Sequence, residues 1–341
     1  MNKKGEYIIN LQFQDAGFFR DGLAKVVSSN GKTEYINEDG KYAIPAQFKS
    51  GTDFVDSLAF VVSDGGYPIC IDKSGETKFQ QKQAKVVCSF SEGLAMFVTS
   101  DQKIGFVDKT GKVVVNSQFD EALSFSEGFA AIKQKDKWGF IDKTGKIVIN
   151  PQFDEVFSFT NGKAAFSNGK QWGFIDNKGS YVINPQFDGI LSFNEGMAPF
   201  LSGKKWCYIN ENAKIEINPQ FDDAAFPFQN GLALIVQDDK GDYINKQGKI
   251  EINPQFEMAS DFIGDIALVE NADKWGIIDK KGKYLVNSQF DDMKAEEYFR
   301  AKYGDRSDYV ISDYYDASNF VSKFFGLILF LRCYEKYFLL L

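Results

Sequence analysis

The chain has 341 residues, of which 44% are hydrophobic and 25% are charged, and its formal net charge is −8. The 34 phenylalanines require a buried core, which excludes an intrinsically disordered chain. Histidine is absent, and this removes Ser-His-Asp and Cys-His nucleophile pairs, His-ligated zinc and the usual general base near neutral pH.

The net charge and the spacing of the cysteines limit which partners and cofactors the protein is expected to bind. Phosphate recognition needs a basic face, but this chain has 47 acidic and 39 basic residues and no long Lys/Arg run. We therefore expect no nucleic-acid partner. Cys70, Cys88, Cys207 and Cys333 are far apart and form no CxxC pair, which favours separate buried thiols. The sequence thus predicts no metal ion and no cofactor.

The N-terminus carries Lys3 and Lys4 but lacks the apolar segment of a signal peptide. The chain as written is therefore expected in the cytoplasm. Lys4 already lies inside the first repeat, however, so a start further upstream would leave the cell envelope open as a location.

A Gln-Phe pair recurs along the chain at intervals of 34 or 35 residues. Phe13 and Phe48 end the first two copies, and Ala84 takes the place of Phe in the third. The later copies end at Phe119, Phe153, Phe187, Phe221, Phe256 and Phe290. Self-similarity at a fixed period is the signature of a repeat architecture, and here it defines nine units over residues 4–293.

A Trp-Gly pair precedes Phe-Ile-Asp in the most complete unit, at Trp138 and Gly139. The pair recurs as Trp172-Gly173 and Trp275-Gly276, and Trp206-Cys207 keeps only the tryptophan. Elsewhere the slot holds Thr33-Glu34, Pro68-Ile69, Ile104-Gly105 and Gly241-Asp242. With this pair and period, the chain resembles the WG-repeat family of bacterial proteins. The resemblance implies a β-rich repeat without an established catalytic residue.

Each unit contains three β-prone runs separated by glycine-containing turns. In the fifth unit, residues 139–142 and 146–149 flank a Lys-Thr-Gly turn, which is typical of a β-hairpin, and residues 129–132 form the third run. Proline cannot donate to a strand ladder, so the recurrent proline slot should lie at a strand end. That slot holds Pro151, Pro185, Pro219 and Pro254.

A unit of about 34 residues cannot bury its own apolar faces, so neighbouring units must stack. Either an open curved or superhelical array or a closed β-propeller would allow this. Propeller blades typically have about 40–45 residues and four strands, in at most about eight copies. Nine three-stranded units therefore favour an all-β repeat protein in an open array, with the closed propeller as the alternative.

Glutamine is the most constant residue of the repeat, because all nine units keep it. A position fixed in every copy is more often set by packing than by a ligand. We therefore expect each Gln amide to be buried and hydrogen-bonded, with the adjacent Phe in the core. These structural positions are Gln118, Gln152, Gln186, Gln220, Gln255, Gln289, Phe119, Phe153, Phe187, Phe221, Phe256 and Phe290, and the earlier glutamines are Gln12, Gln47 and Gln83.

The tryptophans are the binding candidates, because exposed indole rings can form platforms for carbohydrates or peptides. The alternative is that they fill the core, which we favour because Ile104 replaces Trp without disturbing the pattern. The candidates are Trp138, Trp172, Trp206 and Trp275.

An acidic residue follows Gln-Phe in the later units, and lysines occupy the opposite turn. The acidic row indicates either a calcium or cationic-partner surface or a solvated edge. We favour the edge because the chain contains no Asp-x-Asp-x-Asp-Gly loop. The chain also lacks GxSxG, P-loop and dinucleotide-binding motifs, so no catalytic residue is assigned.

The repeat pattern ends near Met293, and residues 294–341 should form a helical cap followed by an apolar tail. Helix formers run to Tyr303, and a second amphipathic stretch runs from about residue 317 to 331. The apolar run is too short for a transmembrane span. The tail could contact a membrane surface or a partner, pack back on the array, or be the start of a truncated second module, which we favour.

The sequence therefore favours a non-enzymatic repeat scaffold that presents an extended surface to a protein or polymer partner. Two alternatives stay open. One is a cell-envelope glycan-binding module that uses exposed aromatic rings. The other is the accessory repeat half of an enzyme whose catalytic domain is missing from this chain.

Overall fold

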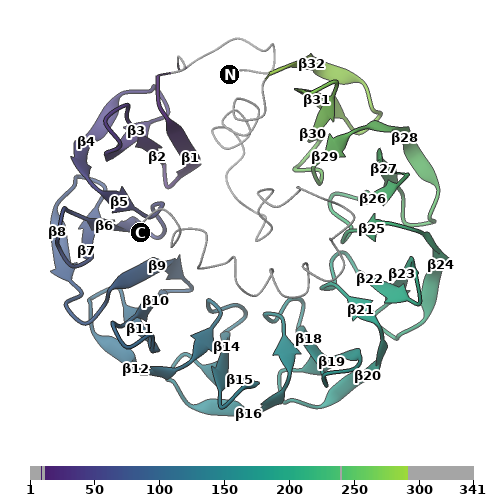
Figure 1. Cartoon of the computed structure of the whole chain (residues 1–341), viewed down its shortest axis with the longest axis horizontal. Coiled ribbons are helices and arrows are strands. Elements are labelled where there is room, and N and C mark those ends of the chain that lie inside the picture. The colour runs from purple at the N-terminus through teal and green to yellow at the C-terminus, as the bar shows by residue number, and fades with distance from the viewer. Residues whose placement is uncertain (1–8, 10–11, 239, 291–341) are drawn as a thin grey trace. The chain divides into compact units, whose positions relative to one another are not determined.

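The computed structural model describes residues 9, 12–238 and 240–290. These residues form thirty-two β-strands, and no helix occurs among them. Each set of four consecutive strands makes one antiparallel sheet, and the eight sheets are numbered 1 to 8 in chain order (Figure 1). The predicted all-β repeat fold is confirmed.

Sheets 1 to 4 come from the first half of the chain. Sheet 1 contains β1 (Asp15–Arg20), β2 (Leu23–Val27), β3 (Thr33–Asn37) and β4 (Tyr42–Phe48). Sheet 2 contains β5 (Ser50–Gly51), β6 (Leu58–Val62), β7 (Ile69–Asp72) and β8 (Thr77–Gln80). Sheet 3 contains β9 (Val86–Ser91), β10 (Leu94–Val98), β11 (Ile104–Asp108) and β12 (Val113–Phe119). Sheet 4 contains β13 (Glu121–Ala122), β14 (Phe129–Gln134), β15 (Lys137–Asp142) and β16 (Ile147–Phe153).

Sheets 5 to 8 repeat the same order. Sheet 5 contains β17 (Glu155–Val156), β18 (Lys163–Ser167), β19 (Trp172–Asp176) and β20 (Tyr181–Phe187). Sheet 6 contains β21 (Gly189–Ile190), β22 (Met197–Ser202), β23 (Lys205–Asn210) and β24 (Ile215–Phe221). Sheet 7 contains β25 (Ala224–Ala225), β26 (Ala233–Gln237), β27 (Lys240–Ile244) and β28 (Ile250–Phe256). Sheet 8 contains β29 (Met258–Ala259), β30 (Ile266–Asn271), β31 (Lys274–Asp279) and β32 (Tyr284–Phe290).

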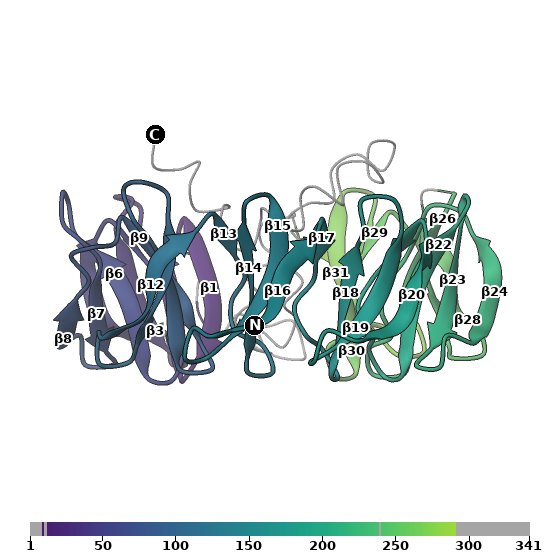
Figure 2. The ribbon, with the colours of Figure 1, turned by 90° about the horizontal axis from the view of Figure 1, so that it is seen from below.

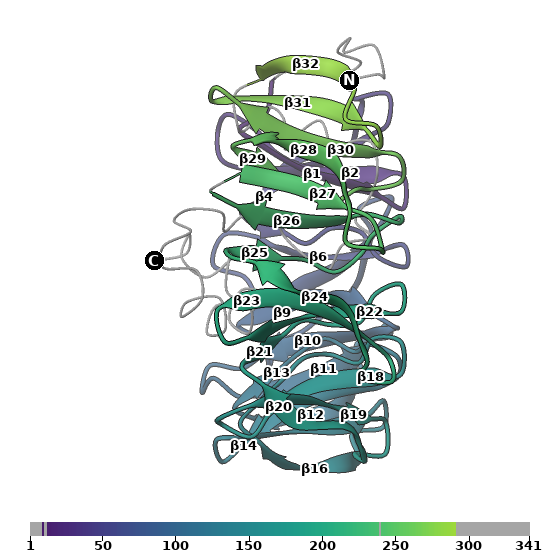
Figure 3. The same cartoon turned by 90° about the vertical axis from the view of Figure 1, so that its right-hand side faces the viewer.

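The strands of one sheet lie side by side in chain order. Figure 2 shows this for β18, β19 and β20, and Figure 3 shows it for β30, β31 and β32. The prediction of three strands per unit is therefore wrong, because each sheet has a fourth strand at its start. In sheet 4 this strand is only Glu121–Ala122, which pairs with Lys133 and Ile132. Two residues are too few to show the alternation by which a strand is recognised in a sequence.

Eight sheets account for eight of the nine expected units. The remaining unit is the first one, which ends at Phe13 and lies largely outside the described residues. The count of nine therefore stays a prediction. The expected helical cap and apolar tail, residues 294–341, also lie outside the described residues. Among the residues that are described, no helix is long and apolar enough to span a membrane.

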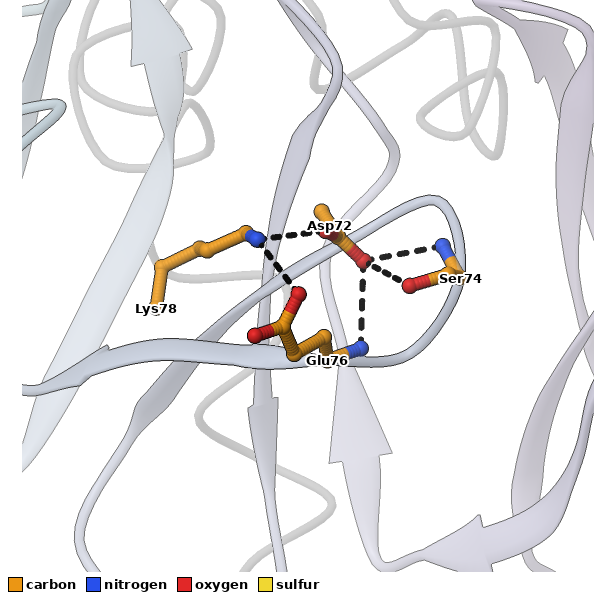
Figure 4. A network of polar contacts seen from close by, with 4 residues as sticks. All are labelled: Asp72, Ser74, Glu76 and Lys78. Carbon is orange, nitrogen blue, oxygen red and sulfur yellow. Dashed lines mark hydrogen bonds and ion pairs between the residues drawn. The ribbon is translucent and has the colours of Figure 1, made fainter.

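The turn between the third and fourth strands is organised by one acidic or amide side chain. In sheet 2, Asp72 Oδ1 accepts hydrogen bonds from the backbone N–H groups of Ser74 at 2.9 Å and Glu76 at 3.1 Å (Figure 4). The ammonium group of Lys78 lies 2.7 Å from Asp72 Oδ2. Lys78 first, and then Ser74, hold the pKa of Asp72 well below its usual range. The equivalent residues are Asn37, Asp108, Asp142, Asp176, Asn210, Asn245 and Asp279.

The glycine that closes this turn also touches the preceding sheet. Gly248 has a φ of +74°, which L side chains rarely adopt, and a Cβ added there would lie 2.9 Å from Ile217 of sheet 6. Gly282 has the same φ and approaches Ile252 of sheet 7 equally closely. Glycine is thus required by backbone conformation and by packing together.

The hydrophobic core lies between neighbouring sheets. One cluster combines Tyr35 and Ile44 of sheet 1 with Phe54 of sheet 2, and another combines Trp206 of sheet 6 with Phe228 of sheet 7. This confirms that units bury their apolar faces against their neighbours. The chain divides into two compact units, one built mainly on sheets 1 to 4 and the other mainly on sheets 5 to 8.

Candidate binding surface

The fourth strand of each sheet is an edge strand, because it has a strand neighbour on one side only. In β20, Ile183 and Phe187 are buried, whereas Asn184 and Gln186 are exposed. The burial pattern is repeated in β16 and β24. The edge strands thus hold apolar side chains against the core and turn amide side chains to solvent.

A bulge interrupts the edge strands β4, β12, β20, β24 and β28. Trp172 of β19 lies opposite Phe187 of β20, but Phe174, two residues further on, lies opposite Ile183. Two residues of β19 therefore match four of β20, and the extra residues fall at Asn184 to Gln186. The proline slot was predicted at a strand end, and this is wrong, because Pro185 lies in the bulge. A bulge tolerates proline because its backbone is locally unpaired.

The bulge explains the glycine of the Trp-Gly pair. A Cβ added to Gly173 would lie 2.5 Å from the carbonyl oxygen of Ile183 and 2.8 Å from the nitrogen of Pro185. At Gly139 the corresponding distances, to Ile149 and Pro151, are 2.5 and 2.6 Å. The backbone of the bulge occupies the space of a side chain, so glycine fits best there.

All four tryptophans are core residues. Trp138, Trp172, Trp206 and Trp275 are only between 2% and 5% exposed. In sheets 5 and 6 each tryptophan lies opposite the Phe of the Gln-Phe pair. The core interpretation is therefore confirmed, and none of these indole rings offers a platform for a ligand.

The glutamines lie where they were not expected. We predicted buried, hydrogen-bonded amides, but all nine Gln side chains are exposed. Side chains alternate across a strand, so burying the Phe turns the adjacent Gln outward. The predicted burial of the Phe is confirmed at Phe119, Phe153, Phe187, Phe221 and Phe256, and Phe290 ends β32.

Six edge strands share one exposed arrangement, Asn-x-Gln, in which x is Pro or Ser. Neither amide side chain of any of the six forms a hydrogen bond with another described residue. We call these segments the amide bulges. They are residues 116–118, 150–152, 184–186, 218–220, 253–255 and 287–289.

The acidic residue after Gln-Phe lies between two consecutive sheets and bonds with residues of either one, as when Asp120 accepts the backbone N–H of Lys135 in sheet 4 at 3.3 Å. Asp120 and Asp222 each lie 2.5 Å from a lysine ammonium group, that of Lys103 and that of Lys205. Asp188 accepts the backbone N–H of Gly203 at 2.8 Å. Within the described residues no group of three or more Cys, Asp or Glu could hold a metal ion.

Acidic turn residues link one sheet to the next. Glu92 of sheet 3 accepts the backbone N–H of Gly128 in sheet 4 at 2.9 Å and lies 3.0 Å from the ammonium group of Lys143. In the half of the chain built on sheets 5 to 8, Glu195 of sheet 6 accepts the backbone N–H of Gly231 in sheet 7 at 3.1 Å. These contacts hold the turns of adjacent sheets together.

Two carboxyl groups occupy the glycine slot, and their burial was missed from the sequence. Asp242 is fully buried, and within the described chain neither of its carboxyl oxygens has a hydrogen-bond partner. Burial, with a smaller contribution from Asp238, raises its pKa to about 7. Burial also raises the pKa of Glu34, and the backbone N–H of Ala46 partly opposes this. An acidic residue in a slot that Gly holds in four of the eight sheets was the signal in the sequence.

The repeat model described as WG containing repeat matches the chain in eight segments, which lie across the eight sheets. They are residues 1–32, 35–67, 104–138, 138–172, 172–206, 208–240, 243–275 and 275–305. The chain belongs to the WG-repeat family. This confirms the resemblance drawn from the Trp-Gly pairs and the period.

Solved structures resemble this WG-repeat chain in fold. A structure described as the eukaryotic initiation factor matches with a TM-score of 0.57 and 11% identity, over 82% of this chain and 88% of that chain. The designed Ika8 protein matches with a TM-score of 0.48 and 11% identity, over 82% and 98%. BamB from Moraxella catarrhalis matches with a TM-score of 0.46 and 12% identity, over 79% and 94%. No curated protein sequence matches the chain.

Proposed function

We propose that this WG-repeat protein is a non-enzymatic scaffold that presents an extended surface to a protein or polymer partner. The amide bulges carry the proposal, because the same exposed and unbonded groups recur on edge strand after edge strand. A small ligand would need one special copy of the repeat. Equal copies suit a long partner that is contacted at many points.

The hydrogen-bond partner of Asp261 supports a binding role over catalysis. Asp261 is half-buried, and burial raises its pKa to about 7 while the Gln229 amide, which donates to it at 3.1 Å, opposes the shift. Acid–base catalysis needs a second group that can transfer protons within reach of the substrate. The amide of Gln229 cannot serve as one. That the repeats are the accessory half of an enzyme stays a prediction.

For the arrangement of the repeats we propose the open array. Every described sheet is built from consecutive strands, and none combines a strand from the start of the chain with one from the end. Four strands per sheet also occur in propeller blades, so strand number does not separate the two architectures. The closed propeller remains the alternative, to be decided by experiment.

A comparison of two immobilised proteins tests the scaffold function. The bulge variant replaces the exposed amides of sheets 5 to 7. Its substitutions are Asn184→Ala, Gln186→Ala, Asn218→Ala, Gln220→Ala, Asn253→Ala and Gln255→Ala. Full-length wild type and bulge variant are incubated with extract of the cells that make the protein. Retained material is analysed by mass spectrometry for protein and by monosaccharide analysis for carbohydrate.

The proposal expects a protein or polymer that wild type retains and the bulge variant does not. The turn variant is the matched control, since it removes exposed amides from the turns of the same three sheets. Its substitutions are Asn177→Ala, Asn212→Ala and Gln247→Ala. Equal retention by wild type and bulge variant would reject the amide bulges as the binding surface.

A further inference from the structure

The retention of glutamine across the repeats calls for an explanation other than packing. All nine units keep Gln although its side chain is exposed, whereas only four keep the buried Trp. Exposed polar residues usually contribute little to stability and tolerate substitution. Because the amides of the amide bulges form no hydrogen bond within the described chain, neither folding nor capping accounts for them.

The chemistry of these groups indicates a neutral ligand. A carboxamide both donates and accepts hydrogen bonds, and so does a sugar hydroxyl. An anionic partner would instead favour Arg or Lys at these positions. Glu251, two residues before the Asn of its amide bulge, is exposed, and the chain carries a net charge of −8. Both features oppose a polyanion.

The geometry disfavours an extended peptide. A peptide adds to a sheet through the free backbone groups of an edge strand. In sheets 5, 6 and 7 the edge strand has a bulge with Pro185, Pro219 or Pro254 at its centre. Proline removes a donor and the bulge disrupts the ladder, so these edges are protected against strand addition.

Exposed apolar residues begin the same edge strands that carry the amides. Tyr181 and Val182, which begin β20, are 54% and 41% exposed, although large apolar side chains are usually buried. Ile215 and Ile250 begin the next two edge strands and are also exposed. An aromatic or aliphatic face beside a hydrogen-bonding group suits a sugar ring, which has C–H faces and hydroxyl edges.

We infer that the amide bulges of sheets 5 to 7, together with the exposed apolar residues that begin their edge strands, bind a neutral polysaccharide. This inference rests on the proposed scaffold function and names its partner class. Each repeat offers one weak subsite, and binding gains strength because one chain contacts several subsites.

Affinity electrophoresis tests the inference with the full-length protein. Native gels contain hydroxyethylcellulose, dextran or glucomannan at increasing concentration, or polygalacturonate as an anionic polymer. We expect at least one neutral polysaccharide to retard wild type and the turn variant. The bulge variant should bind that polymer at least about tenfold more weakly. The melting temperatures of all three proteins should agree within about 2 °C.

Three results would overturn the inference: no retardation by any neutral polymer, retardation by polygalacturonate alone, or equal retardation of the bulge variant. A large fall in the melting temperature of the bulge variant would also overturn it, since the amides would then be structural. If cell extract yields a protein that depends on the amide bulges while no gel retards wild type, the scaffold function stands and the polysaccharide is rejected.

Discussion

Asp242 places a carboxyl group under a bulge, in a slot that glycine holds in four of the eight sheets. Its carboxyl is fully buried and has no hydrogen-bond partner in the described chain, because the opposing edge strand has Pro254 where an N–H could have donated. Glu34 in the same slot faces Ala46, which supplies that N–H. The N–H of Ala46 thus satisfies part of the Glu34 carboxyl, although Glu34 Oε1 has no hydrogen-bond partner in the described chain.

Asp242 should make the protein less stable at neutral pH than at mildly acidic pH. Its folded-state pKa of about 7 lies above the unfolded value of about 3.9, so the folded state holds the proton more tightly. The free energy of unfolding therefore falls as pH rises from about 4 to about 7, by at most about 4 kcal/mol. Asp242→Asn should reduce this fall by the share that Asp242 causes, whereas the share from Asp261, whose pKa burial also raises to about 7, should remain. Urea unfolding at pH 5 and pH 8 measures both.

Asp238→Asn is the matched control for Asp242→Asn. Asp238 is exposed and acts on Asp242 only through its charge, so its loss should change the pH dependence less. If Asp242→Asn left the difference between pH 5 and pH 8 as large as in wild type, the buried carboxyl would not be its source.

Replacing Ala213 by glycine should stabilise the protein. It closes the turn of sheet 6 with a φ of +60°, where the equivalent residues in sheets 7 and 8 are Gly248 and Gly282. An L residue in this region costs about 1–2 kcal/mol, and the lost methyl contact with the core cluster offsets part of the gain. We expect Ala213→Gly to raise the free energy of unfolding by up to about 1 kcal/mol in urea melts.

Gly248→Ala is the reciprocal experiment. It adds the same conformational cost and brings a methyl group within 2.9 Å of Ile217, so it should lower stability by more than Ala213→Gly raises it. Equal and small effects of the two substitutions would contradict the requirement for glycine in this turn.

At the scale of single elements, the turn acid is the organising residue. Asp142 Oδ1 accepts hydrogen bonds from the Thr144 backbone N–H at 2.9 Å, the Thr144 hydroxyl at 2.6 Å and the Lys146 backbone N–H at 3.1 Å. Asp142→Ala should destabilise the protein by about 1–2 kcal/mol because these donors lose their partner.

Asp142→Asn should largely restore stability, because Asn210 and Asn245 fill the same position in sheets 6 and 7 with the same backbone bonds. Thermal unfolding of the two variants separates the loss of an acceptor from the loss of a charge. An alanine variant as stable as wild type would show that glycine alone shapes the turn.

The sequence predicted the second, third and fourth strands of each sheet because each has an alternating or apolar run bounded by a glycine turn. It did not reveal the first strand, since the two residues of β13 or β17 form no pattern. The sequence analysis predicted buried Gln side chains because all nine repeats keep Gln, and it therefore did not find the exposed amides. The alternation that buries Phe187 already turns Gln186 outward, so strand geometry was the better guide.

At the scale of the whole molecule, each sheet depends on its neighbours. Core clusters combine residues of adjacent sheets, and turn residues such as Glu92 bond from one sheet to the next. Stability should then be close to a sum of sheet terms and interface terms. Whether the protein still folds after the loss of one repeat depends on the architecture, because a closed propeller needs its first and last sheets to pack together and an open array does not.

Deletion of one complete repeat tests this. Removing residues 155–188 takes out sheet 5 and joins Asp154 to Gly189, which restores the order found at Asp188 and Gly189. An open array should still fold cooperatively, with a urea m-value lower by about one-eighth because one of eight sheets is lost. A closed propeller would have to re-form with a changed geometry between all its sheets, so aggregation or loss of cooperative unfolding would favour closure. Removing only residues 155–171 is the control, since it leaves half a sheet and should prevent folding in either architecture.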